Sequence, residues 1–262
     1  MLRWHGEKYI MKINIISFVI GITAGIFGGL AGLGGGLIMI PLMAGVLKLN
    51  QHKAHGTSLV ALVFTGISGA ITYSLNGAID ITAAVLLALT AVFTAPFGAR
   101  YAHTLEEWKL KKFFGAFLIF CSALLLLKPY LANIIGTVPD YAKIMVFLIT
   151  GAFTGFLSGM MGVGGGTIMV PVMVILAGFT QHVAQGTSLL VMVPTGGIGA
   201  FTHWKMGNVA VQILFGLIPG ILLGTYFGGN FANIIPDNTL RLIFAFIIIF
   251  LGFRYFKTSS PE

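Results

Sequence analysis

The chain has 262 residues, of which 57% are hydrophobic and only 8% are charged, and its formal net charge is +8. A soluble domain carries roughly 25% charged residues, so this composition excludes a water-soluble globule and predicts an all-α polytopic membrane protein. The basic residues lie in short stretches between apolar runs, as in the cytoplasmic loops of membrane proteins, which argues against nucleic acid as a partner.

Five apolar segments are predicted in the first half of the chain. They span residues 13–33, 37–49, 57–76, 79–101 and 110–127. Four of them approach the roughly 20 residues that cross a bilayer as a helix, whereas the short second segment covers only about 20 Å of a core about 30 Å thick. The first segment is too long for a signal peptide, and no small-residue cleavage site follows it.

The second half repeats the first at a shift of 130 residues. Between Gly21 and Thr72, 24 of 52 positions are identical to their counterparts. The matching apolar segments span residues 144–163, 167–179, 187–204, 209–228 and 240–256. Duplication of this kind is common in transporters, and a duplicated scaffold without transport is the alternative. The predicted division is a tail at 1–12, a first repeat at 13–128, a linker at 129–142, a second repeat at 143–257 and a tail at 258–262.

The lysines and arginines indicate whether the short segments cross the membrane. If all ten segments cross and the N-terminus is cytoplasmic, 12 of the 15 basic residues are cytoplasmic and 3 lie outside. If the short segments do not cross, the split is 8 to 7. The positive-inside rule favours the first arrangement. Five crossings per repeat turn the second repeat upside down. We therefore predict two inverted-topology repeats, each of four long helices and one short broken helix, with both termini cytoplasmic and an extracytoplasmic linker.

Three consecutive glycines precede each short segment. They are Gly34, Gly35 and Gly36 in the first repeat, and Gly164, Gly165 and Gly166 in the second. A helix that begins there leaves its first backbone N–H groups unpaired, at the positive end of its dipole. Because the short helices would enter from opposite sides, we expect two opposed sets of N–H groups near the midplane, an arrangement suited to an anion. Close helix packing is the alternative, and it is the preferred explanation for the glycines at 21, 25 and 29 and at 151, 155 and 159.

A polar stretch follows each short segment. Its hydroxyl groups, at Thr57, Ser58, Thr187 and Ser188, are expected to cap the next helix, to contact the ligand, or both. Its leading residues, Gln51, His52, Gln181 and His182, either gate the two mouths of the pathway or lie at the membrane interface. Tyr73 and His203 occupy matching positions, where they serve either as interfacial anchors or in proton coupling.

Charged residues are absent from the centres of the predicted segments. This argues against a cation site and against a carboxylate proton relay, and it leaves an anion as the consistent substrate. One cysteine, Cys121, excludes a thiolate-rich site, and the sequence predicts no metal and no cofactor. An intramembrane enzyme lacks support, because no carboxylate pair or nucleophile–base pair stands at an informative spacing.

A paired motif carries a resemblance to a known family. It reads Gly-x-Gly-Gly-Gly-x-x-x-x-Pro, at Gly32–Pro41 and Gly162–Pro171, and it is followed each time by a Gly-Thr-Ser stretch. This pattern resembles the TauE/SafE sulfite exporter family of membrane transporters, over nearly the whole chain. The resemblance implies movement of a small sulfur-containing anion, such as sulfite or an organosulfonate, across the inner or plasma membrane. The repeats differ at His55, where the second has Gln185, so the two mouths are not chemically equivalent.

The leading hypothesis is a secondary transporter, and an exporter, that alternates access around a midplane site formed by the six glycines. A passive anion channel is the alternative, followed by a lipid flippase or an intramembrane enzyme. The coupling ion is left open between proton and sodium, and the glycine faces permit a homodimer.

Overall fold

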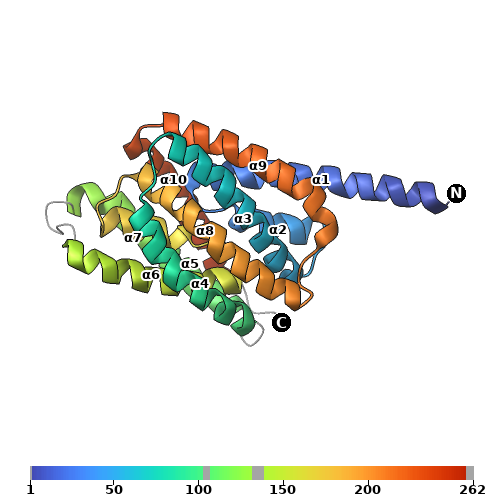
Figure 1. Ribbon diagram of the computed structural model, residues 1–262, viewed down its shortest axis with the longest axis horizontal. Helices are drawn as coiled ribbons and strands as arrows, with labels where there is room; N and C mark the ends of the chain where they lie inside the picture. Colours follow the sequence, from blue (N-terminus) through green and yellow to red (C-terminus); the bar gives the residue numbers. More distant parts are fainter. Residues whose placement is uncertain (1, 103–106, 132–138, 258–262) are drawn as a thin grey trace.

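The computed structural model describes residues 2–102, 107–131 and 139–257, which form ten helices and no strand. In chain order they are α1 Leu2–Ala31, α2 Gly36–Gly45, α3 Gln51–Leu75, α4 Ile81–Tyr101, α5 Glu107–Leu131, α6 Asp140–Met161, α7 Gly166–Ile175, α8 Gln181–Lys205, α9 Val211–Ile234 and α10 Asp237–Phe256 (Figure 1). The prediction of an all-helical protein is therefore confirmed.

The predicted segments correspond one by one to these helices, with shifted ends. α2 and α7 have 10 residues each, so each is only about 15 Å long. α1 begins at Leu2, so most of the predicted tail at 1–12 belongs to its first turns. Residues 132–138 of the predicted linker and the tail at 258–262 lie outside the described residues.

The membrane-facing surface is apolar. Five helices among the described residues are long and apolar enough to cross a membrane: α4, α3, α9 and the greater parts of α1 and α6. Their outer faces and that of α10 expose large side chains, including Phe93, Phe97, Phe215, Phe227, Phe231, Phe246 and Phe250. Side chains of this kind face lipid at little cost, whereas a water-soluble protein rarely exposes so many together.

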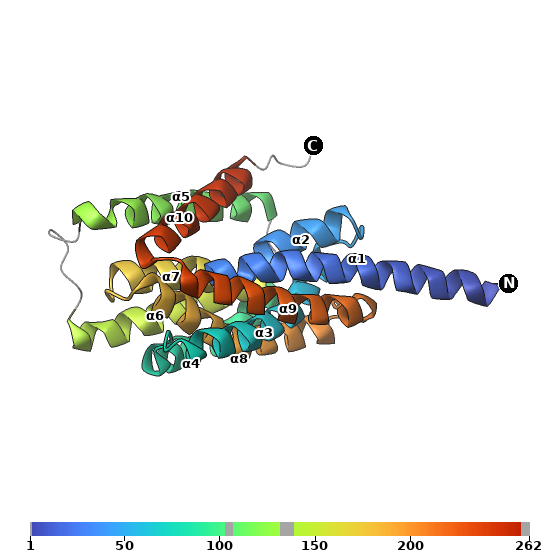
Figure 2. The ribbon, with the colours of Figure 1, turned by 90° about the horizontal axis from the view of Figure 1, so that it is seen from above.

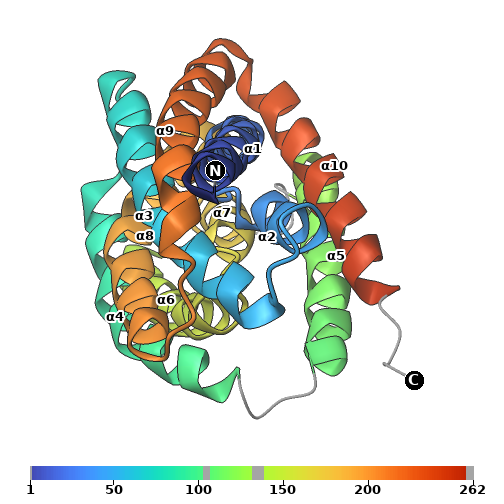
Figure 3. The same cartoon turned by 90° about the vertical axis from the view of Figure 1, so that its right-hand side faces the viewer.

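Helices from the two halves pack against each other in a crossed pattern. α1 packs on α9, and its counterpart α6 packs on α4, which is the counterpart of α9. α3 packs on α8, and α5 on α10. Seen from the end, α5 and α10 form one edge, and α2 and α7 lie between that pair and the α3–α8 pair (Figure 3). The two short helices therefore lie among the long ones, and the residues that begin them, Gly36 and Gly166, are buried.

Glycines make the crossed contacts close. A Cβ atom at Gly25 would lie 2.7 Å from the carbonyl oxygen of Ile221 on α9. Its counterpart on α6, Gly155, approaches the backbone of α4 at Ala91 even more closely. The packing explanation for these glycines is therefore confirmed, since only a residue without a side chain allows backbones this near each other.

Candidate functional site

The two short helices begin at matching glycine loops, which we define as residues 32–36 and 162–166. Gly34 and Gly164 have φ angles of 81° and 89°, in the left-handed region that glycine adopts without strain. The first bonds of α2 run from the amides of Ile38 and Met39 to the Gly35 oxygen, at 3.1 and 2.9 Å. The amides of Gly36 and Leu37 thus precede any intrahelical bond.

α7 begins in the same way. Its first bonds run from Ile168 and Met169 to the Gly165 oxygen, at 3.1 and 3.0 Å, so the amides of Gly166 and Thr167 precede them. All residues of both glycine loops are buried. Four backbone N–H groups without intrahelical acceptors therefore lie inside the protein, at the positive ends of two helix dipoles.

The two glycine loops touch each other. A Cβ atom at Gly36 would lie 2.5 Å from the carbonyl oxygen of Gly162 and 2.9 Å from Val163 Cα. A Cβ atom at Gly166 would overlap the carbonyl oxygen of Gly32. The sequence predicts two opposed N-termini; their direct backbone contact depends on the tertiary fold.

Each loop is held by a serine from the other half. Ser58 Oγ on α3 lies 2.6 Å from the Gly162 oxygen, and Ser188 Oγ on α8 lies 2.8 Å from the Gly32 oxygen. Each hydroxyl also lies 2.8 Å from a carbonyl of its own helix, at His55 or Gln185. Each serine hydroxyl therefore holds a loop of the other half by donating a hydrogen bond to its carbonyl oxygen.

The predicted capping role of the Thr-Ser pairs is wrong. α3 begins at Gln51, six residues before Thr57, and its N-cap is Asn50, whose side chain accepts from Lys53 N at 2.8 Å. Asparagine is among the strongest N-cap residues, and the polar stretch after it continues as helix. Thr180 has the same role at the start of α8.

The threonines bind turns of the opposite half instead. Thr57 Oγ1 accepts from Ala210 N at 2.9 Å, in the connection between α8 and α9. Thr187 Oγ1 accepts from Asp80 N at 2.9 Å, in the connection between α3 and α4. Both threonines are fully buried. Each half thus contributes one threonine hydroxyl that accepts a hydrogen bond from a backbone amide in a turn of the other half.

Two residues at the centre were missed by sequence reasoning. Leu62 and Met192 are counterparts at the 130-residue shift, and both are almost fully buried. Both side chains lie against Gly34 and Gly164; a Cβ atom at Gly164 would stand 3.3 Å from Leu62 Cδ2 and 3.4 Å from Met192 Sδ. An apolar residue in mid-helix carries no signal of function, so only the position of its side chain reveals this contact.

Unpaired polar groups lie beside the glycine loops. Thr167, in the first turn of α7, is 1% exposed, and its hydroxyl finds no partner among the described residues. Gln185 is fully buried, with one amide atom bonded to Tyr73 and the other unpaired within the described chain, and its Cβ lies against Gly32. Buried polar groups normally have partners, so these two side chains bring unpaired hydrogen-bonding atoms to the glycine loops.

The interfacial-anchor explanation of Tyr73 and His203 is also wrong, because both are fully buried. The Tyr73 hydroxyl lies 2.9 Å from the Gly29 oxygen and 2.8 Å from Gln185 Oε1. His203 Nε2 lies 3.2 Å from the Gly159 oxygen, the matching carbonyl of the other half. Both rings are therefore buried against the last turn of α1 or α6, just before the glycine loop that follows.

The leading residues of the polar stretches are not equivalent in the two halves. Gln181 is fully buried, whereas Gln51 and His52 are half-buried. His182 joins α8 to the start of α10, with Nδ1 3.3 Å from Asp237 Oδ1 and Nε2 3.0 Å from the Ile235 oxygen. The amide of Gln181 donates to the same Asp237 oxygen at 2.5 Å, so both residues belong to a contact between the start of α8 and the start of α10.

The crossed serine bonds predict a coupled loss of stability. We expect Ser58→Ala and Ser188→Ala each to lower the free energy of unfolding by about 1–3 kcal/mol, because each leaves a buried carbonyl without its donor. Since the two loops touch, the double variant should depart from the sum of the single effects. Unfolding midpoints of the purified protein in detergent measure all three.

Ser17→Ala is the matched control. Ser17 is equally buried, but its hydroxyl bonds to the Ile13 oxygen one turn earlier in its own helix, at 2.8 Å. Removing it leaves the contact between the halves unchanged. The coupling would be contradicted if the double variant lost the sum of the two single losses of unfolding free energy, and if each single loss were no larger than that of Ser17→Ala.

Comparisons with known proteins identify the family of the chain. The sulfite exporter TauE/SafE family matches residues 17–255. The chain belongs to this family. It is 28% identical to the probable membrane transporter protein YunE of Bacillus subtilis, over 91% of this chain and 95% of the relative. It is 29% identical to YdhB of the same organism, over 88% and 94%. A probable membrane transporter protein of Methanocaldococcus jannaschii is 25% identical, over 89% and 92%. No solved structure matches the chain.

The protein is therefore a multi-pass membrane transporter and not an enzyme. The family match covers both glycine loops and all ten helices at least in part. The resemblance drawn from the paired glycine motif is thus confirmed.

Proposed function

We propose that this transporter carries a small sulfur-containing oxyanion, such as sulfite or an organosulfonate, by secondary transport with alternating access. The observation that carries the proposal is the meeting of the two glycine loops, where four amides without intrahelical acceptors lie buried. Two helix dipoles contribute roughly half a positive charge each at this point. An oxyanion is stabilised by such groups, whereas a cation is repelled.

Thr167 and Gln185 extend the donor set. The Thr167 hydroxyl and the unpaired amide atom of Gln185 lie in or against the loops and have no partner in the described structure. Ser58 and Ser188 already bond to loop carbonyls, so we assign them to holding the loops rather than to the anion. We assign Thr57 and Thr187 to holding the turns that they bond, at Ala210 and Asp80, rather than to contact with the anion.

The burial of the two glycine loops favours alternating access rather than a continuous pore. Both loops are buried, and Leu62 and Met192 fill the space beside Gly34 and Gly164. An anion reaches the amides only when these side chains move and the loops separate. Methionine suits such a position, because its unbranched side chain changes shape easily.

We further propose that the two halves cross the membrane in opposite directions. α1 runs from the right end of the molecule towards the left, α6 runs from left to right, and α2 and α7 lie on opposite sides of the centre (Figure 2). The 12-to-3 distribution of basic residues supports the same topology, with both termini cytoplasmic. Inverted halves would present the site alternately to the two sides by equivalent movements.

The candidate coupling ions are the proton and sodium. His203 is buried on α8, with Nε2 3.2 Å from the carbonyl oxygen of Gly159, and we assign it as the candidate proton carrier of the second half. Tyr73 occupies the matching place in the first half and is bonded to Gln185.

Thr167→Val tests the anion site. Valine keeps the volume and removes a hydroxyl that has no partner among the described residues, so we expect the unfolding midpoint to stay or rise. The same variant should raise the KM for sulfite by about tenfold to a hundredfold, the effect of losing one hydrogen bond to a charged group, about 1.5–3 kcal/mol. Initial flux of sulfite into proteoliposomes measures the KM.

Thr225→Val is the matched control. Thr225 is also fully buried with an unpaired hydroxyl, but it lies on α9 where that helix contacts α1 at Gly29. It should gain stability in the same way and keep the wild-type KM. If Thr167→Val and Thr225→Val have the same KM for sulfite, the proposed anion site is wrong. Flux that does not saturate with sulfite would favour a channel.

A further inference from the structure

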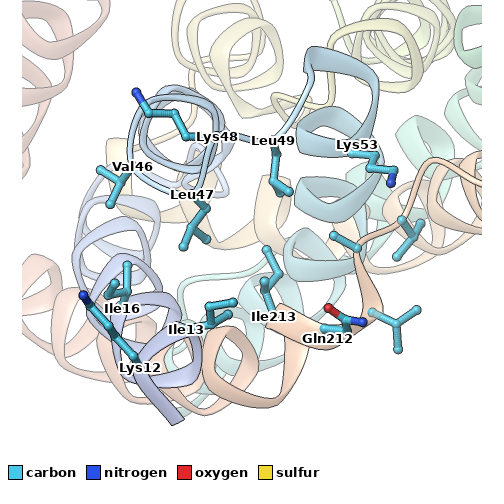
Figure 4. A pocket seen from close by; sticks show the side chains of 13 residues that line it. Lys12, Ile13, Ile16, Val46, Leu47, Lys48, Leu49, Lys53, Gln212 and Ile213 are labelled. Atoms are coloured by element: carbon cyan, nitrogen blue, oxygen red, sulfur yellow. The ribbon is translucent and has the colours of Figure 1, made fainter. Parts of the chain in front are cut away.

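A cavity opens at one end of the molecule, outside the glycine loops. Its volume is about 740 Å³, and it lies between the first part of α1, the connection from α2 to α3 and the connection from α8 to α9. Lys12, Lys48 and Lys53 stand around it, one on α1 and two beside the start of α3 (Figure 4). None of the residues that line it is acidic. We call this cavity the lysine vestibule.

Lys48 has an unusual backbone conformation. Its φ angle is 55°, and it is the only residue other than glycine with a positive φ in the described chain. The matching residue of the second half is Gly178, with φ of 76°. Both residues close the end of a short helix, where the next amide bonds back to Met43 or Met173, at 3.2 and 3.1 Å. The helix end therefore requires the left-handed conformation, which glycine meets without strain and lysine does not.

A strained residue is retained where its side chain has a use. The backbone conformation at position 48 favours glycine, so a lysine there points to a role of its side chain. Its surroundings are the vestibule and two further lysines, which are exposed like Lys48 itself. Three like charges at one opening repel one another unless an anion lies between them.

The matching positions of the other half lack this charge. The three lysines correspond to Ala142, Gly178 and Val183. Over all thirteen lining positions, the vestibule holds three lysines and no acid, whereas their counterparts hold one lysine and one acid, Lys143 and Asp80. The formal charges are therefore 3 − 0 = +3 and 1 − 1 = 0. The two halves therefore share the glycine loops but differ in formal charge at these lining positions.

The vestibule leads towards the glycine loops. Val209 and Ala210 line it, and the amide of Ala210 donates to Thr57 Oγ1 at 2.9 Å. The next residue on α3, Ser58, bonds to the loop at Gly162. Thr57, which contacts the lining of the vestibule, and Ser58, which holds a glycine loop, are therefore consecutive residues of α3.

We propose that Lys12, Lys48 and Lys53 form a capture site for a small oxyanion at one entrance of the transporter, in front of the Thr57–Ala210 contact. This inference rests on the proposed function, because the captured anion is the one that the glycine loops receive. On the proposed topology this entrance is cytoplasmic, so the capture site draws its substrate from the cell interior. An opening lined by one sign of charge raises the local concentration of counter-ions.

The test compares wild type with the triple variant Lys12→Gln, Lys48→Gln, Lys53→Gln in phosphatidylcholine proteoliposomes. At an ionic strength of 0.01 M, where the Debye length is about 30 Å, we expect initial flux at sub-saturating sulfite to fall about threefold to tenfold. At 1 M salt, where that length is about 3 Å, the two proteins should agree. Maximal flux should not change.

Two further variants separate capture from folding. Lys48→Gly removes the charge and relieves the backbone, so it should raise the unfolding midpoint while lowering flux at low salt. Lys143→Gln, at the other end, is the matched control and should leave the salt dependence of flux unchanged. A deficit of equal size in Lys143→Gln, or none in the triple variant, would overturn the capture site.

A lipid headgroup offers the same oxyanion chemistry as the free anion. If the lysines hold a headgroup instead, the deficit of the triple variant will appear only in vesicles that contain phosphatidylglycerol, and the proposal is then wrong. Binding of radiolabelled sulfite to the detergent-solubilised protein is measured alongside. If wild type carries no sulfite, the transport proposal fails, and the presence or absence of lysine-dependent binding decides the vestibule independently.

Discussion

Alanine in place of Gly166 is expected to reduce sulfite flux by about tenfold or more, although alanine suits the helical backbone there. The added Cβ would overlap the carbonyl oxygen of Gly32 and stand 2.8 Å from Met192 Cε. The closed loops can accept it only by moving apart, which makes the closed state of the transport cycle about 1–3 kcal/mol less stable. The middle of that range, about 2 kcal/mol, corresponds to more than a factor of ten. Gly36→Ala should behave alike, because its Cβ would lie 2.5 Å from the Gly162 oxygen.

Gly45→Ala is the control for both variants. Gly45 ends α2, the short helix that Gly36 begins, and nothing lies within 4 Å of the position that its Cβ would take. Alanine there should leave flux unchanged and add a few tenths of a kcal/mol to about 1 kcal/mol of stability, as it does in other helices. Flux is normalised to the amount of folded protein in the vesicles. Wild-type flux in Gly166→Ala would show that transport does not depend on the close approach of the loops.

Leucine in place of Gly155 is expected to prevent the protein from accumulating in the membrane. Its Cβ would overlap the backbone oxygen of Ala91 and the hydroxyl of Thr94 on α4, so the α4–α6 contact would have to open along its length. We expect a loss of at least about 3 kcal/mol, at the upper end of overpacking effects, because the obstacle is backbone and cannot rotate away. Gly25→Leu should do the same to α1 and α9.

Gly197→Leu gives the comparison, since it lies on α8 with open space where its side chain would start. The yield of monodisperse protein from solubilised membranes, and its unfolding midpoint, measure the three variants. Equal yields for Gly155→Leu and Gly197→Leu would mean that the crossed helix pairs do not need their glycines.

The helices were predictable because their signal is local. Each apolar run appears as a helix, and the broken segments begin at Gly36 and Gly166 as the glycine triplets indicate. Their ends were less predictable: the Gln51–Ser58 stretch extends α3 by two turns, because Asn50 caps the helix earlier than the threonine. Capping depends on which of several suitable residues bonds first, and sequence periodicity does not rank them.

The candidate site was only half predictable. The glycines were identified from the repeat, and Thr167 could have been, since the first repeat has Leu37 in its place. Leu62 and Met192 could not, because an apolar side chain in mid-helix has the same pattern in a core and beside a ligand. The lysine vestibule was also missed, since its residues come from three segments far apart in the chain.

The sequence by itself determined the membrane-embedded helical class, the duplication, the two broken helices and the family, because composition, periodicity and repeated glycines are properties of neighbouring residues. The tertiary structure decided which half supports which. Ser58 holds the loop of the second half and Ser188 that of the first, and each threonine holds a turn across the same boundary. Such crossed contacts join residues more than 100 positions apart, and their partners are backbone groups, which are alike at every position of the sequence.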